Sequence, residues 1–208
     1  MLTSLERIRI HPKSGNEKLH YDGESVDIDL LSFWIWSASD FISNTTRGIL
    51  AEFIVAKGMG NISSGVRNEW EPYDLETDDG IKIEVKSAAY VQSWHQHKLS
   101  HISFRVQKKL VWEANTNRRE GVAKRPADVY VFALLSHKDK MTIDPLNLKQ
   151  WEFFVLPTEV LNQRKRSQHS ITLKSLDRIS GGSVNFFELK AAVIEAQLNN
   201  IKLVGQLS

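Results

Sequence analysis

Two acidic residues and a lysine, Asp74, Glu84 and Lys86, stand in a stretch that reads as a β-hairpin, EPYDLETDDGIKIEVKSAAY. Carboxylate oxygens bind hard cations such as Mg²⁺ or Mn²⁺. A nearby ammonium group also lowers the repulsion between neighbouring carboxylates. These residue types therefore suit a site for a divalent cation, provided that the hairpin brings their side chains together.

The alternation of apolar and charged side chains indicates the register of this hairpin. If residues 78–80 form a three-residue turn with Gly80 in the left-handed conformation, Leu75 faces Ile83 and the other apolar side chains also pair. A two-residue turn would set Leu75 against Glu84 and bury the wrong side chains. The three-residue turn is therefore predicted.

This register sets Asp74 directly opposite Glu84, with about 5 Å between their β-carbons. Facing carboxylates repel each other unless a positive charge lies between them. Lys86 on the same face is one candidate and a divalent cation is the other, because the chain has no cysteine that would favour a softer metal. The alternative is an exposed hairpin face that carries ordinary Glu–Lys pairs.

A fourth candidate, Glu52, lies in the segment TRGILAEFIVAKGMG, residues 46–60, which has helical periodicity. Residues 43–45 offer N-caps, and Gly58 and Gly60 supply a C-terminal stop. The apolar surface of this predicted helix consists of Leu50, Phe53, Ile54 and Ala56. An unpaired acid among such residues is costly, so Glu52 is expected to complete the acidic site.

The rest of the chain reads as one mixed α/β domain, residues 26–208, that follows a polar N-terminal arm, residues 1–25. Its core is expected at about 44–135 and a C-terminal elaboration at 137–208. Residues 26–42 predict a helix, and the side chains that it would bury are Leu30, Phe33, Trp34 and Trp36.

Several later segments also have clear patterns. Residues 127–135, ADVYVFALL, predict a buried strand. WEFFVLPTEVLNQ predicts a strand followed by a turn or short helix after Pro157, and SITLKSLDRI is either a strand or the start of a helix. EANTNRREGVAKRP predicts a loop, and NFFELKAAVIEAQLNN predicts an amphipathic helix.

Together these residues resemble the PD-(D/E)XK nuclease superfamily, which has the restriction-endonuclease-like fold. The resemblance covers roughly residues 44–94, with 127–135 as a later core strand. It implies an α/β core with a mixed central β-sheet flanked by helices. The sequence departs from the family in one respect, since Tyr73 separates Pro72 from Asp74; Asp78 and Asp79 are rival acids, but they fall in the turn.

The resemblance also implies roles for the residues. Asp74, Glu84 and the backbone carbonyl of Val85 would hold Mg²⁺ or Mn²⁺. Lys86 would position the attacking water or help to deprotonate it, and Glu52 would orient a metal-bound water or support a second ion.

Other residues are candidates for contact with active-site acids or substrate. Gln92 would hydrogen-bond to the acids or to the substrate, although it is equally well read as an ordinary polar residue after a strand. The substrate-binding candidates are Trp94, His95, Arg105, Lys108 and Lys109. A zinc site built from His95, His97 and His101 is not favoured, because the chain has no cysteine and no His-Glu-x-x-His motif.

Charge and composition fit a nucleic-acid partner. The 208 residues carry a net charge of +2, with basic clusters at 118–119, 124–125 and 164–166 and acids gathered at 69–84, although each cluster is also read as a solvated face. No apolar run is long enough to span a membrane and no secretory signal is evident, so a cytoplasmic location is expected. Residues 137–208 offer a recognition surface or a dimer contact, so a homodimer is also considered.

The sequence therefore predicts a Mg²⁺-dependent DNA endonuclease of restriction or repair type. The alternative is a catalytically inactive nuclease-like subunit that binds DNA or serves in assembly.

Overall fold

The computed structural model describes residues 8–60, 65–110, 112–113, 118–119 and 121–206. The contacts divide the chain into two compact units, residues 1–39 with 64–68, and residues 40–63 with 69–208. The boundary between arm and domain that the sequence suggested, after residue 25, falls inside a strand of the first unit.

The first unit contains a hairpin of β1 (Lys18–Tyr21) and β2 (Glu24–Asp29), followed by α1 (Leu30–Ala38). Asp22 and Gly23 between the strands both have positive φ, as a tight two-residue hairpin turn requires. The carboxylate of Asp29 caps α1 by accepting a hydrogen bond of 2.7 Å from the Ser32 amide.

The helix predicted for residues 26–42 is therefore shorter, because its first four residues are part of β2. The predicted burial of Leu30, Phe33, Trp34 and Trp36 is wrong, since every residue of α1 is at least partly exposed and the side chain of Trp36 is 84% exposed. A two-stranded hairpin offers too little apolar surface to cover an aromatic helix.

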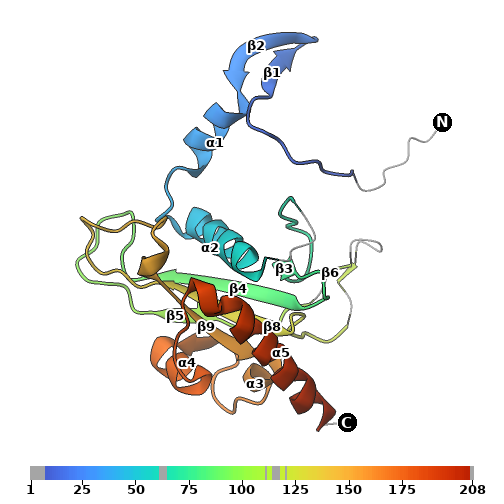
Figure 1. The fold of residues 1–208 in the computed structure, drawn as a ribbon, viewed down its shortest axis with the longest axis vertical. Coiled ribbons are helices and arrows are strands. Elements are labelled where there is room, and N and C mark those ends of the chain that lie inside the picture. Colours follow the sequence, from blue (N-terminus) through green and yellow to red (C-terminus); the bar gives the residue numbers. More distant parts are fainter. Residues whose placement is uncertain (1–7, 61–64, 111, 114–117, 120, 207–208) are drawn as a thin grey trace, which may run out of the picture. The chain divides into compact units, whose positions relative to one another are not determined.

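The second unit is built on a four-stranded mixed sheet in the order β3–β4–β8–β9. The strands are β3 (Leu75–Glu76), β4 (Lys82–Ala89), β8 (Val129–Leu135) and β9 (Trp151–Pro157). β4 and β8 are parallel, and the other neighbours are antiparallel (Figure 1). Every residue of β8 is buried, which confirms the predicted core strand.

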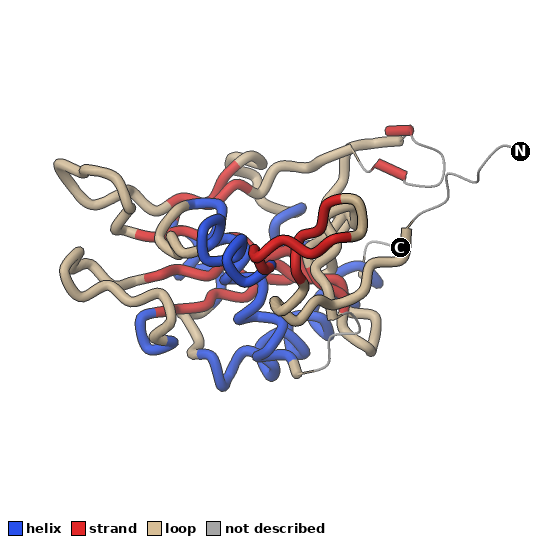
Figure 2. Tube along the Cα trace, turned by 90° about the horizontal axis from the view of Figure 1, so that it is seen from above, coloured by secondary structure: helices blue, strands red, loops and turns tan. Residues whose placement is uncertain are grey.

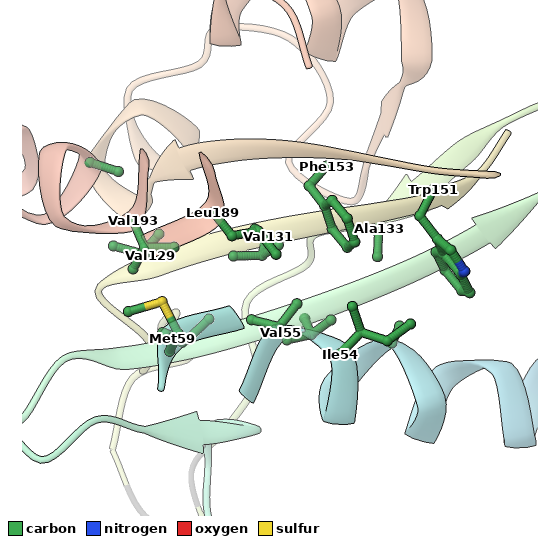
Figure 3. Close-up of a cluster of buried hydrophobic side chains, with 14 of the residues drawn as sticks. Ile54, Val55, Met59, Val129, Val131, Ala133, Trp151, Phe153, Leu189 and Val193 are labelled. Atoms are coloured by element: carbon green, nitrogen blue, oxygen red, sulfur yellow. The ribbon is translucent and has the colours of Figure 1, made fainter. Parts of the chain in front are cut away.

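One face of this sheet packs against two helices, α2 (Asn44–Met59) and α5 (Leu189–Gly205). The Ser43 side chain caps α2. Of the two glycines predicted to stop this helix, Gly58 lies inside it and Gly60 ends it in the left-handed conformation. Figure 3 shows Ile54, Val55 and Met59 of α2 meeting the sheet residues. Phe53, predicted on the apolar surface of α2, is instead 57% exposed, because the apolar face is rotated toward Ala51 and Val55.

The other face of the sheet packs against α3 (Thr158–Asn162), α4 (Leu173–Ser180) and the antiparallel pair of β5 (Ser103–Arg105) and β10 (Ser170–Thr172). Residues 170–179, for which the sequence allowed either a strand or a helix, contain both, since β10 leads directly into α4. Helices on both faces of a mixed sheet confirm the predicted α/β class, and Figure 2 shows the strands running alongside one another.

Short elements complete the chain. β6 (Trp112–Glu113) pairs with β7 (Arg118–Arg119) inside the predicted loop 113–126, part of which lies outside the described residues. Two 3₁₀ turns, η1 (Leu148–Gln150) and η2 (Phe186–Glu188), precede β9 and α5. In the part of the chain that the structure describes, no helix has the length and apolar character needed to cross a membrane.

Candidate active site

The hairpin of β3 and β4 has the predicted turn. The Thr77 amide donates to the Ile81 carbonyl at 3.1 Å, and Gly80 has a φ of 81°. Leu75 faces Ile83 as the apolar pattern required. The predicted three-residue turn and this pairing are therefore confirmed.

The pairing of β3 with β4 ends at Leu75 and Ile83, so the pair of Asp74 with Glu84 that the sequence suggested does not form. The Asp74 amide donates to the carbonyl of Ile83 at 3.1 Å, so the regular alternation is broken. The carboxylate Oδ2 of Asp74 then accepts a hydrogen bond of 2.7 Å from the Val85 amide. The expected strand pairs of Asp74 with Glu84 and of Tyr73 with Val85 are thus wrong, because an aspartate side chain replaces the backbone partner of Val85.

Glu84 is almost completely buried, with 3% of its surface exposed. Lys86 Nζ donates to its Oε1 at 2.6 Å. Lys109 Nζ lies 3.2 Å from Oε1 and 3.1 Å from Oε2. A buried carboxylate needs such cationic partners, and here two partly exposed lysines supply them.

Asp74 lies within electrostatic reach of the other predicted acids. The pKa of its carboxyl group is raised to about 6, mainly by burial and then by the negative charges of Glu84 and Glu52. The charge of Lys86 and the hydrogen bond from Val85 act in the opposite direction. The structure thus brings together the predicted helix-borne acid, the two hairpin acids and the lysine.

The acidic residues of this cluster offer carboxylate oxygens, the ligands that hard cations prefer. Among the described residues, no group of three or more His, Cys, Asp or Glu side chains is close enough to hold a metal ion. Asp74 and Glu84 nevertheless offer neighbouring carboxylates, whose repulsion favours a cation between them. The Val85 carbonyl remains a predicted ligand.

Tyr130 of β8 is a member of the site that the sequence did not suggest. It pairs with Glu84 in the parallel ladder and is 2% exposed. Burial raises the pKa of its phenol, followed by the charge of Glu84. No local pattern could have identified it, because the β4–β8 pairing joins segments far apart in the sequence.

Gln92 lies beyond the opposite end of β4, in a different network. Its side-chain Nε2 donates to the Ala89 carbonyl at 3.0 Å and to Ser100 Oγ at 3.3 Å. Its Oε1 accepts from Arg47 at 3.3 Å. The structure thus groups Gln92 with Arg47 and not with the acids, and its predicted catalytic role stays a prediction.

The proposed substrate-binding residues are placed differently from one another. Lys109 contacts Glu84, whereas Trp94 is half exposed and its carbonyl accepts a hydrogen bond from Lys140. His95 packs edge-on against His97 at 4.9 Å between ring centroids. The exposed residues Arg105 and Lys108 lie in and just after β5. Their contacts with a substrate stay predictions.

Comparison with known proteins identifies the family. A search of curated proteins gives no match. Residues 31–175 match the family model of bacteriophage T4 endonuclease IV, and this range contains every candidate described above. Since the match spans more than half of the 208 residues, the chain belongs to the bacteriophage T4 endonuclease IV family.

Proposed function

We propose that the protein is a metal-dependent DNA endonuclease of the PD-(D/E)XK type, with Asp74, Glu84 and Lys86 as its catalytic residues. Membership of an endonuclease family supports nuclease chemistry. The observation that carries the assignment to these residues is the buried Glu84 carboxylate, held by Lys86 beside an aspartate whose pKa is raised to about 6.

The donor set fits a hard divalent cation. Asp74 and Glu84 supply carboxylate oxygens, and the Val85 carbonyl and Glu52 are further candidates. Bound there, Mg²⁺ or Mn²⁺ would polarise the phosphoryl oxygen and lower the pKa of a coordinated water.

The side chains of the protein have separate tasks in the hydrolysis. Lys86 holds the attacking water and offsets the negative charge that accumulates on the phosphoryl oxygens as water adds to phosphorus and the bond to the leaving oxygen breaks. Glu84 keeps Lys86 in place through their contact of 2.6 Å. Lys109 shares the charge of Glu84, so that Lys86 can turn toward the substrate without leaving a buried carboxylate unpaired.

Nicking of supercoiled plasmid tests this function. Wild-type protein is incubated with Mg²⁺, with Mn²⁺ or with EDTA, and open-circular product is measured on a gel. Cleavage with either metal and none in EDTA is the expected result. Binding of DNA without cleavage under all conditions would contradict the proposal and favour an inactive DNA-binding subunit.

A further inference from the structure

A buried arginine, Arg125, ties the segment around Val106 to the loop that follows α3. Its Nε donates to the Val106 carbonyl at 2.8 Å, and its Nη1 donates to Asn162 Oδ1 at 2.7 Å. Its Nη2 donates to the carbonyl and the Oε1 of Gln168, at 3.0 and 2.9 Å. The planar guanidinium thus fixes two segments that are distant in the sequence.

Backbone bonds join the same two segments. The Val106 amide donates to the His169 carbonyl at 2.8 Å, and Arg105 faces Ser170 in the β5–β10 pair. The loop 163–169 is therefore held beside residues 105–106 by main-chain and side-chain contacts together.

This loop has a strongly basic composition. Its sequence, QRKRSQH, contains Arg164, Lys165 and Arg166 and no acid. Lys165 and Arg166 are exposed, and Arg164 donates to the Ser170 carbonyl at 3.4 Å. Burial, and after it the charge of Arg166, lowers the pKa of Arg164, so these cations repel one another. Such a cluster costs folding energy unless it meets an anion.

The cluster is connected to the active site by Lys109, which contacts Glu84. The backbone amides of Lys109 and Lys124 each donate to the carbonyl of the other at 3.0 Å. Lys109 is therefore held beside Lys124, the residue that precedes Arg125. Lys109 is the third residue after Val106, so the two Cα atoms are no more than about 11 Å apart. That distance corresponds to about three nucleotides of one strand.

The packing of the sheet follows the same path. Tyr130, which pairs with Glu84, belongs to the same buried cluster as Val106 and Ile171, the residues that flank the basic loop and its partner segment. Glu84 and the basic loop thus lie on the same face of the sheet.

We propose that Arg105, Lys108, Lys109, Lys165 and Arg166 form one surface, the basic track, which binds the sugar–phosphate backbone of DNA and leads it to Glu84. This inference rests on the proposed nuclease function for its choice of DNA. Exposed cations spaced along a surface suit phosphates, which carry one negative charge at each nucleotide.

Binding to a labelled 20-nucleotide strand and to its duplex tests the basic track. Fluorescence anisotropy gives Kd in EDTA over a range of salt concentrations, and a gel checks that the DNA stays intact. The test variant is Lys165→Gln/Arg166→Gln, and the matched control is Lys190→Gln/Lys202→Gln, whose exposed lysines lie on α5, on the other face of the sheet.

The test variant is expected to bind the preferred DNA about tenfold more weakly than the control. The slope of log Kd against log salt should become less steep by about 1.4 to 1.8, the loss of two phosphate contacts. The melting temperature of neither variant should fall below that of the wild type, since both pairs of residues are exposed.

Equal Kd and equal salt slopes in the two variants would overturn the basic track, even if the wild type nicks plasmid. Tighter binding of the matching RNA than of DNA by the wild type would overturn the choice of DNA. Failure of plasmid nicking would instead contradict the proposed function, and a selective loss of binding in the test variant would still support the basic track.

Discussion

Polar groups are buried near both ends of β4, and the two networks differ in one decisive respect. At one end, the guanidinium of Arg47 donates to neutral oxygens of Ile42, Asn44, Ser87 and Gln92. At the other end, Glu84 lies beside Asp74, and two lysines are drawn to its carboxylate. The first network satisfies its own members, whereas the second contains acids that repel each other.

This difference separates structural from chemical roles. A buried donor that finds neutral acceptors contributes to folding and needs no ligand. Neighbouring carboxylates reduce stability, and a pKa raised in this way is typical of a functional site. The four predictions below test this division.

The largest effect is expected in the acidic network. Glu84→Gln or Lys86→Ala should reduce the rate of plasmid nicking by about 10³-fold, because each removes charge at the point where the phosphodiester reacts. The matched control is Lys82→Ala, which removes a lysine from the same face of β4 and should nick plasmid at the wild-type rate. A similar loss of activity in all three variants would contradict the special role of Glu84 and Lys86.

Arg47→Ala should have the largest effect on folding in the other network. It removes four hydrogen bonds from a residue that is 3% exposed, and it leaves Asn44 and Gln92 acceptors without their donor. The free energy of unfolding in urea should fall by about 3 kcal/mol. Lys57→Ala, an exposed change on the same helix, should alter it by less than about 0.5 kcal/mol. An unchanged stability of Arg47→Ala would show that the network does not hold α2.

Asp74 should make stability depend on pH when metal is removed with EDTA. Its folded-state pKa of about 6 is higher than the ordinary value of 3.8, so the folded protein holds this proton more tightly than the unfolded chain does. Stability should therefore fall as the pH rises from about 4 to 7, by about 2 kcal/mol after allowance for partial exposure. Asp74→Asn should abolish this decline, since its Oδ1 can still accept from Val85. Urea unfolding at pH 4 and pH 7.5 measures both proteins, and parallel pH profiles would contradict the assignment.

The smallest effect should follow from Gln92→Ala. The loss of contacts with Arg47, Ala89 and Ser100 should lower the free energy of unfolding by about 1 to 2 kcal/mol. Plasmid nicking by the folded protein should change by less than about threefold. A 100-fold loss of activity at unchanged stability would return Gln92 to the catalytic site.

The sequence alone predicted the local parts of the site because they obey short-range rules. Strict alternation in β4 and the glycine at position 80 determine the turn and the facing of Leu75 with Ile83. The cap and stop residues of α2 likewise lie beside the helix that they limit. These features depend on neighbours in the chain.

The remaining features depend on contacts between distant segments. Tyr130 and Lys109 reach Glu84 through strand pairing and through a loop that no periodic pattern describes. The hydrogen bond from Val85 to Asp74 ended the ladder one residue early. The aromatic residues of α1 looked like core residues, but every residue of this helix is at least partly exposed.

The central claim is that Asp74 and Glu84 are the metal-binding half of an active site. A crystal soaked in Mn²⁺ tests it most directly, because anomalous scattering locates the ion independently of activity. The account predicts an anomalous peak within coordination distance, about 2.2 Å, of carboxylate oxygens from both residues. A peak at another site with none between Asp74 and Glu84, or Lys86 and Lys109 still bound to a metal-free Glu84 at saturating Mn²⁺, would contradict it.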